Sequence, residues 1–270
     1  MILTDYGRMG VYEKYNRELK SNNMTQKEAV IEIIKTFGGV ATLNQIYQGV
    51  FKYEDCKWNT KTPFASIRCI LQRSPKEIYK IKPGLYGLIA SKKQHEDNGI
   101  VEQTDNNENS EIVKAFNHTY YQGLLLEIGR LHEFETFVPV QDKNKIFPGG
   151  SSLGEMSTLE RIPSFTFDKF VQRSSTIDVI WFNKSYLPNS FFEVEHSTDI
   201  QNSLLKYYDL RDFAARMVIV ADSKRRPEFD KKLGFSAFAS IKDRVKFLSY
   251  ESLDKQYNQE IQKRKFEFIL

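Results

Sequence analysis

A pair of apolar segments joined by a polar turn, within residues 174–197, constrains the fold of this chain more than any other feature. The first segment reads Ile-Asp-Val-Ile-Trp-Phe, the second reads Ser-Phe-Phe-Glu-Val-Glu-His, and Asn, Lys, Ser and Pro lie between them. β-Branched and aromatic residues on both sides of such a turn predict a β-hairpin. The hairpin is expected to lie in a core because it carries large aromatic side chains, namely Trp181, Phe182, Phe191 and Phe192.

Acidic residues interrupt both apolar segments. Asp178 lies in the first, and Glu193 and Glu195 lie in the second, separated by one residue. Because side chains alternate along a strand, both Glu side chains project from the same face. If Asp178 shares that face, three carboxylates gather there and repel one another unless a cation lies between them. Clustered carboxylate oxygens suit Mg²⁺. An edge hairpin with a solvated acidic face is the alternative.

The placement of Asp178 and of Glu193-x-Glu195 on successive strands resembles the signature of the PD-(D/E)XK nuclease superfamily. The resemblance implies a metal-dependent nuclease in which Asp178 and Glu193 bind one or two Mg²⁺ ions. Two positions depart from the usual pattern, since Glu195 stands in place of a Lys and Ile177 in place of a Pro. A Glu-x-Glu version occurs among restriction endonucleases.

The same resemblance suggests roles for neighbouring residues. Glu195 is expected to act as a general base or to contact the metal through water. Lys206, on the helix after the hairpin, is the alternative source of the missing cation. Glu127 lies in the helix before the core sheet, where the superfamily often has a further catalytic acid, and a solvated position is the alternative. His196 points away from the face of Glu195 and is expected in the core or behind the catalytic residues.

The order of the predicted elements agrees with the α/β core of that superfamily over roughly residues 111–250. Apolar residues at helical spacing predict a helix over 111–131, and the run Met-Val-Ile-Val-Ala is typical of a buried parallel strand. The insertion 141–173 is expected to be a loop with little regular structure. The other predicted elements are strands at 134–140, 216–222 and 244–250, a helix at 199–213 capped by Thr198, and a helix at 226–233.

Helix-start patterns recur before this region. Capping boxes begin at Thr25 and Thr42, and Thr62-Pro63 precedes a third apolar helix face. A β-hairpin that turns at Pro83-Gly84 follows. Three helices and a terminal hairpin predict a winged helix-turn-helix. The closing Pro-Gly-Leu-Tyr-Gly-Leu resembles the end of the HARE-HTH domain, a winged-helix family found fused to restriction enzymes and chromatin proteins.

Basic residues are in excess in this N-terminal part. Residues 1–90 contain 14 Lys and Arg against 8 Asp and Glu, whereas the net charge of the whole chain is only +4. A recognition helix and wing that carry cations fit double-stranded DNA as the partner, although winged helices also bind proteins. The residues expected to contact DNA are Lys61, Thr62, Arg68, Arg73, Lys80 and Lys82.

These patterns predict an α/β (α+β) protein of two domains. Residues 1–90 form the winged-helix domain, with an arm or lead-in helix over 1–23. Residues 91–110 are polar and acidic and are expected to be a flexible linker. Residues 111–270 form a restriction-endonuclease-like domain, in which helices flank a mixed β-sheet.

Several classes of protein are excluded by what the sequence lacks. Cys56 and Cys69 have no Cys or His at zinc-ribbon spacing, so neither a zinc ribbon nor a disulfide framework is expected. No Gly-rich phosphate loop is present, so no nucleotide cofactor is expected. No apolar run reaches the length of a membrane span and the start does not read as a signal peptide, which predicts a cytoplasmic protein without a membrane partner.

The function expected from these observations is a Mg²⁺-dependent endonuclease of double-stranded DNA, of the type II restriction class, with a winged-helix reader. Two alternatives stay open. One is a DNA-binding regulator with a non-catalytic nuclease-like domain, and the presence of all three carboxylates argues against it. The other is a structure-specific repair nuclease. A homodimer also stays open.

Overall fold

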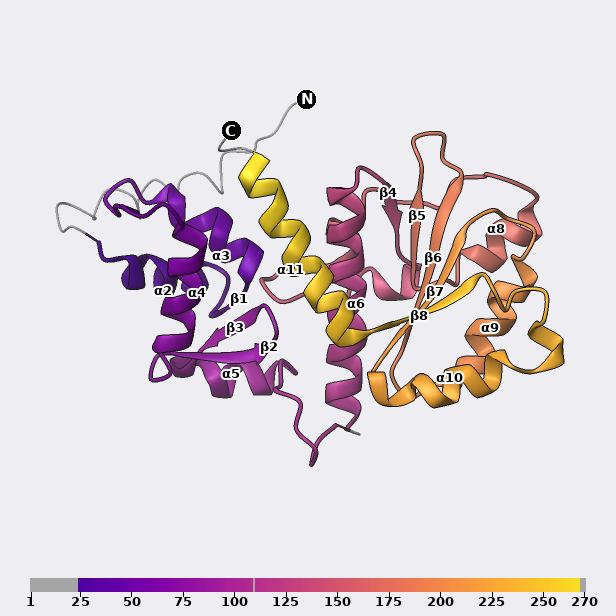
Figure 1. The fold of residues 1–270 in the computed structure, drawn as a ribbon, viewed down its shortest axis with the longest axis horizontal. Coiled ribbons are helices and arrows are strands. Elements are labelled where there is room, and N and C mark those ends of the chain that lie inside the picture. Colours follow the sequence, from indigo (N-terminus) through magenta and orange to yellow (C-terminus); the bar gives the residue numbers. More distant parts are fainter. Residues whose placement is uncertain (1–23, 109, 268–270) are drawn as a thin grey trace, which may run out of the picture.

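The structure, a computed structural model, describes residues 24–108 and 110–267 and contains two β-sheets with helices around them (Figure 1). The smaller sheet has the strand order β1-β3-β2 and the larger has the order β4-β5-β6-β7-β8. This mixture of helices and sheets agrees with the predicted α+β class. Within the described ranges, no helix is both long and apolar enough to cross a bilayer. The predicted lead-in helix falls within residues 1–23, outside the described residues.

The N-terminal unit contains the predicted helices and hairpin. The side chains of Thr25 and Thr42 close capping boxes with Glu28 and Gln45, as predicted. Thr62 precedes the third helix, which has proline at its start, but its side chain makes no capping hydrogen bond. All strand pairs in this sheet are antiparallel. The elements are α2 (Gln26–Thr36), β1 (Val40–Thr42), α3 (Leu43–Gly49), α4 (Pro63–Arg73), β2 (Ile78–Lys82) and β3 (Leu85–Leu88).

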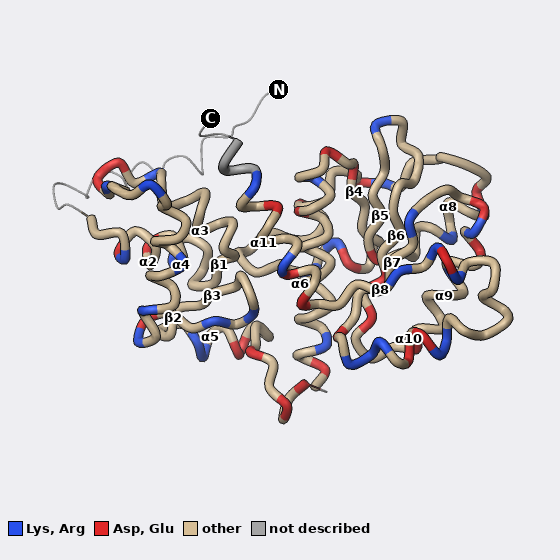
Figure 2. The backbone as a smooth tube through the Cα atoms, viewed as in Figure 1, with Lys and Arg blue, Asp and Glu red and all other residues tan. Residues whose placement is uncertain are grey.

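The connection between the units is only partly the irregular linker that was predicted. Its first residues form α5 (Lys92–Asp97), in which His95 is buried. The His95 ring stacks on Tyr79 of β2, and His95 Nδ1 lies 2.9 Å from the Tyr79 hydroxyl. The prediction of a linker from residue 91 was therefore wrong for α5, because this contact holds the helix on the small sheet. Acidic residues mark the connection that follows α5 (Figure 2).

The C-terminal unit has the predicted order of helices and strands. Strand β5 pairs antiparallel with β4 and β6, whereas β7 pairs parallel with β6 and β8. The α9 helix is capped by Asp199, whose side chain accepts from the Gln201 N–H, and not by Thr198 as predicted. The elements are α6 (Glu111–Leu131), β4 (Glu135–Phe137), β5 (Val179–Phe182), β6 (Pro188–Glu195), α9 (Ile200–Asp209), β7 (Arg216–Ala221), α10 (Arg226–Leu233), β8 (Val245–Ser249) and α11 (Tyr250–Glu267).

Helix α11 was not predicted. It lies between the N-terminal unit and α6, and both helices stand on one side of the larger sheet (Figure 1). Its buried side chains recur at helical spacing, at Leu253, Tyr257 and Ile261. These residues join one apolar cluster with α6 and with the core of the N-terminal unit, so the two units share a continuous core.

The larger sheet is apolar on both faces, and its residues alternate between two clusters. Val179 and Trp181 pack toward α6, whereas Ile180 and Phe182 pack toward α9 and α10. A strand buried on both faces reads as a continuous apolar run, which is how β5 and β7 appear in the sequence. A polar side chain in such a strand must therefore face a helix rather than solvent.

The insertion 141–173 is more regular than predicted. It contains α7 (Leu153–Met156) and α8 (Asp168–Ser174). Ser152 and Glu155 form a capping box at the start of α7, and this Ser-x-x-Glu pattern was overlooked in the sequence. The insertion also binds the edge strand β4, because the Thr136 N–H donates to Thr158 Oγ1 at 2.7 Å.

A glycine permits the close approach of α6 to β5. A Cβ atom at Gly129 would lie 2.6 Å from both Thr136 Cγ2 and Trp181 Nε1, and Trp181 Nε1 donates to the Leu125 carbonyl at 3.0 Å. Alanine at position 129 would gain about 1 kcal/mol in helix propensity, but overpacking costs roughly 1–3 kcal/mol and would disturb the Trp181 hydrogen bond.

We expect Gly129→Ala to lower the free energy of unfolding, measured by urea denaturation. Arg130→Ala, at the exposed neighbouring position, should change it by less than about 0.5 kcal/mol. An unchanged or stabilised Gly129→Ala protein would contradict this packing.

Candidate active site

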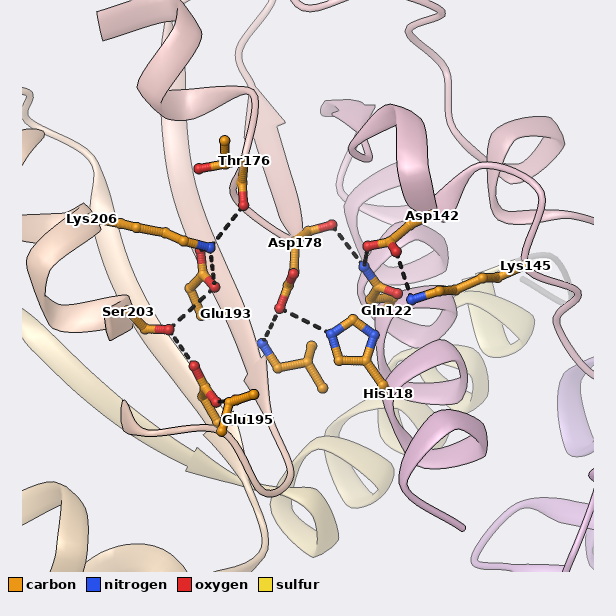
Figure 3. Close-up of polar contacts among 12 residues, drawn as sticks. His118, Gln122, Asp142, Lys145, Thr176, Asp178, Glu193, Glu195, Ser203 and Lys206 are labelled. Carbon is orange, nitrogen blue, oxygen red and sulfur yellow. Dashed lines mark hydrogen bonds and ion pairs between the residues drawn. The ribbon is translucent and has the colours of Figure 1, made fainter. Parts of the chain in front are cut away.

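Strand register brings the predicted carboxylates together. Val179 pairs with Phe192 in the antiparallel β5–β6 ladder. Extended by one residue, this register places Asp178 opposite Glu193. The Val194 N–H donates to Asp178 Oδ2 at 2.8 Å, which fixes the Asp178 side chain at the junction of the two strands. The site therefore lies at the carboxyl end of β6, beside the parallel strand β7 (Figure 3).

Glu193 is buried and paired with a lysine. Its side chain is 3% exposed, and Lys206 Nζ on α9 lies 2.9 Å from both of its carboxylate oxygens. Lys206 also donates to the Thr176 carbonyl at 2.8 Å. Burial first, and then repulsion by Asp178, raises the pKa of Glu193 well above its usual value, against the opposing effect of Lys206. The ionised form of Glu193 is therefore costly in the folded protein.

Glu195 shares the face of Glu193, as the alternation predicts, but has different partners. Ser203 of α9 donates to Glu195 Oε1 and lies 3.3 Å from Glu193 Oε2. Thr198 donates to Glu195 Oε2, and Arg225 Nη1 is 4.0 Å from the same oxygen. Burial raises the pKa of Glu195, and the two hydroxyl donors oppose that shift. Both oxygens of Glu195 are thus occupied.

Helix α6 contributes residues that the sequence analysis missed. His118 Nε2 lies 3.3 Å from Asp178 Oδ2. Burial raises the pKa of Asp178, but the hydrogen bond and charge of His118 and the Val194 N–H outweigh it, so the net pKa is lowered. Gln122, one turn later, donates to the Asp178 carbonyl at 3.2 Å and to Asp142 Oδ2 at 2.7 Å. Polar residues four apart in an apolar helix were the available signal.

Glu127 lies outside this cluster, contrary to its predicted role. It follows His118 by nine residues on α6, which corresponds to half a turn around the axis and about 13.5 Å along it. Its carboxylate accepts a hydrogen bond from Tyr257 of α11. It also has a side-chain hydrogen bond with Asn44 of α3, so the carboxylate points toward α11 and the N-terminal unit and not toward Asp178.

Among the residues expected to contact DNA, Lys61, Thr62, Arg73 and Lys80 are exposed. Arg68 is partly buried, and its guanidinium donates to the Tyr47 hydroxyl at 2.9 Å.

Lys82 is not available to DNA, and this prediction is corrected. Lys82 is only 7% exposed. In a regular strand Lys80 and Lys82 would share a face. The β2–β3 register shifts between them, which breaks the alternation, so Lys80 stays exposed while Lys82 points toward α6.

His196 was expected in the core or behind the catalytic residues. It is half-buried, and its ring lies beside Tyr250 and the Glu108 carbonyl, which His196 Nε2 approaches to 3.2 Å. No contact joins its ring to the three carboxylates within the described ranges.

The donor set has the chemistry of a hard-cation site. Asp178 and Glu193 offer carboxylate oxygens across one strand junction, and Asp178 Oδ1 accepts no hydrogen bond from a described residue. Lys206 already supplies a positive charge to Glu193. In residues 24–108 and 110–267, no group of three or more His, Cys, Asp and Glu is arranged to enclose a metal ion. Among the described residues, Asp178 Oδ1 is therefore the oxygen of this carboxylate pair that has no hydrogen-bond donor, whereas both oxygens of Glu193 contact Lys206.

Comparison with known proteins gives one family and one relative. Residues 99–269 match the family described as the type II restriction enzyme NmeDI C-terminal domain. The type II restriction enzyme NmeDI of Neisseria meningitidis serogroup C is 27% identical over 151 residues, which cover 52% of this chain. The match spans 42% of that relative, less than half of its length. No solved structure matches the chain.

The raised pKa of Glu193 predicts a gain in stability when its charge is removed. A carboxyl group with a raised pKa in the folded state costs no stability below its unfolded value near 4.5 and costs progressively more as pH rises above it. We expect Glu193→Gln to raise the melting temperature at pH 7.5 by roughly 2–4 °C, equivalent to about 1 kcal/mol. Lys206 keeps the Thr176 carbonyl as a partner.

The gain should shrink as the pH approaches 5, and scanning calorimetry at both pH values measures it. Glu111→Gln, which removes an exposed carboxylate, is the matched control. A lower melting temperature for Glu193→Gln at pH 7.5 would show that the Lys206 pair outweighs the repulsion.

Proposed function

Because the chain belongs to the family of the type II restriction enzyme NmeDI C-terminal domain, we propose that it is a Mg²⁺-dependent endonuclease of double-stranded DNA. The observation that carries the proposal is the junction of β5 and β6. Asp178 and Glu193 face one another there, and Lys206 Nζ lies 2.9 Å from both oxygens of Glu193. A carboxylate pair beside an ammonium group suits phosphodiester hydrolysis.

The proposed fold is that of the PD-(D/E)XK superfamily. A helix followed by three antiparallel strands, a helix, a parallel strand, a helix and a further parallel strand supports this assignment. The acidic residues lie on the second and third of these strands, where the superfamily signature has them. The assignment rests on topology and on these residues, since no solved structure matches.

Each residue of the cluster has a proposed part in the reaction. Asp178 and Glu193 would hold Mg²⁺, which supplies positive charge to the phosphate and favours ionisation of water. His118 and the Val194 N–H hold Asp178 in place. Lys206, anchored by the Thr176 carbonyl, presents its ammonium group beside Glu193, where it can orient the attacking water and offset negative charge in the transition state.

Lys206, and not Glu195, completes the site in this proposal. Both oxygens of Glu195 receive hydroxyl donors, from Ser203 and Thr198, which leaves it poorly placed to take a proton from water. Lys206 comes from the helix after the hairpin, so it supplies the cation that the superfamily usually takes from the position of Glu195. Glu195 instead orders the start of α9.

These roles predict a ranking of activities. Asp178→Asn, Glu193→Gln and Lys206→Met should each lower Mg²⁺-dependent cleavage of duplex DNA by roughly 10²-fold or more. Glu195→Gln should lose less, and EDTA should abolish cleavage by the unchanged protein. Glu127→Gln is the matched control, since Glu127 is a partly buried carboxylate away from the site. Single-turnover cleavage at saturating protein measures the ranking. If Glu127→Gln and Glu193→Gln lose the same factor in cleavage rate, Glu193 is not an active-site residue.

The N-terminal unit is the proposed winged-helix reader. Three helices beside an antiparallel sheet have the composition of that motif. Lys61 lies just before α4 and Arg73 ends it, and both are exposed. Lys80 is exposed on β2. These cations would contact phosphates, which position a reader on the duplex without specifying sequence.

Removing these cations should weaken DNA binding in a salt-dependent manner. Each cation that no longer neutralises a phosphate reduces the slope of log K against log salt by about 0.9. We expect Lys61→Gln, Arg73→Gln and Lys80→Gln each to weaken binding and to flatten that slope, measured by fluorescence anisotropy at several salt concentrations. Lys231→Gln, an equal charge change at an exposed site of α10, should leave both unchanged. If the slope of log K against log salt changes only in Lys231→Gln, the duplex binds the C-terminal unit and not the N-terminal unit.

A further inference from the structure

Lys82 is enclosed by aromatic rings of the other unit. Its ammonium nitrogen lies 5.8 Å from the ring centre of Phe116, 5.7 Å from that of Tyr120 and 5.1 Å from that of Tyr121. Phe116 lies on one turn of α6, and Tyr120 and Tyr121 lie on the next. A cation over aromatic faces is attracted by their negative charge, and the attraction grows when water is excluded. A strand end of the N-terminal unit is thereby held on a helix of the C-terminal unit.

An acidic residue of α11 lies close to the same ammonium group. Asp254 is 2% exposed, and Tyr121 donates to its Oδ2 at 3.4 Å. Burial lowers the pKa of Lys82 to about 8, with Asp254 opposing the shift, and burial raises the pKa of Asp254 to about 7, with Lys82 opposing. Asp254 Oδ1 is buried and has no hydrogen-bond partner in the described part of the chain. Each group thus offsets part of the cost of burying the other, and Asp222 and Glu251 add smaller favourable contributions to the charge of Lys82.

The turn next to Lys82 is also docked. Gly84 has φ +88°, and a Cβ atom built on it would lie 2.7 Å from Asn258 Oδ1 of α11. The Gly84 carbonyl accepts from the Leu43 N–H at 2.7 Å. The tip of the β2–β3 hairpin therefore packs against α11 instead of projecting into solvent, so it is a contact between the units.

The turns of α6 that receive Lys82 also carry the residues beside Asp178. His118 lies two residues after Phe116 and two before Tyr120, which places it on the opposite side of the helix. Gln122 follows His118 by one turn and shares its side. One side of this short stretch of α6 thus contacts the N-terminal unit, and the other contacts the catalytic cluster.

We propose that Lys82 is a specificity-determining residue that locks the N-terminal unit onto residues 116–122 of α6, and so fixes the distance between the DNA sequence that is read and the bond that is cut. The inference rests on the proposed endonuclease function and reader. With the units locked, a duplex bound by α4 would reach Asp178 at a fixed number of base pairs from the sequence that is read. Without the lock, the reader and the cluster move independently, and the position of the cut becomes variable.

The test reverses the charge at position 82, which lies among the rings of Phe116, Tyr120 and Tyr121 (the aromatic cage). Lys82→Glu places a second carboxylate beside Asp254 and removes the cation from the aromatic rings. Lys76→Glu, an exposed residue just before β2, is the control with the same charge change. Hydrogen exchange without DNA should show β2 and β3 of Lys82→Glu exchanging at least 10-fold faster than in the unchanged protein, whereas Lys76→Glu should match it. Asp254→Asn is a milder change and should raise the exchange rate of β2 and β3 by a smaller factor. It replaces Lys82→Glu as the test variant if Lys82→Glu does not fold.

Cleavage products of an end-labelled duplex, resolved at single-nucleotide length, give the second measurement. The unchanged protein and Lys76→Glu should cut at one position, and Lys82→Glu should spread the cut over neighbouring positions. Unchanged exchange and a single cut position in both Lys82→Glu and Asp254→Asn would overturn the proposal. Faster exchange in these variants, combined with no cleavage by the unchanged protein, would remove the proposed function but leave the lock in place.

Discussion

Mutual repulsion of carboxylates at the β5–β6 junction is the constraint on which the rest of the C-terminal unit depends. The strand register places Asp178 and Glu193 opposite one another, and alternation adds Glu195 on the same face. Because Glu193 and Glu195 are buried, water screens their charges only weakly. Neutralisation comes from Lys206 on α9 and from His118 on α6, one from each helical layer. The sheet therefore keeps its acidic residues only because helices on both sides bring donors to them.

The part of this site that lies within one hairpin could be predicted, because a strand period of two is a local property. That is why the shared face of Glu193 and Glu195 was correctly placed. His118 and Gln122 could not be placed in the same way, since their partner Asp178 is more than fifty residues away in the sequence and their four-residue spacing shows only that they share a side of α6. Glu127 was chosen because the superfamily often has a further acidic residue in the helix before the core sheet, but half a turn around α6 separates it from His118.

The errors outside the site have separate physical causes. Lys82 was predicted to contact DNA because it lies with Lys80 on the predicted wing hairpin, and a register shift between the two turns Lys82 toward α6. Helix α5 depends on the burial of His95 against Tyr79, a tertiary contact that an acidic, polar segment does not reveal. Helix α11 did carry a sequence signal, in the spacing of Leu253, Tyr257 and Ile261, and its many charged residues concealed it.

The docked hairpin limits how proteins of this kind can diverge. Exchange of the whole N-terminal unit by recombination would bring in a foreign turn, and only one with a residue as small as Gly84 and a cation at the position of Lys82 would fit Asn258 and the aromatic cage. Point substitutions on the exposed surface of α4 meet no such requirement. In the proposed reader, new target preferences are therefore expected to accumulate residue by residue on that surface, while the junction with α11 and α6 stays the same.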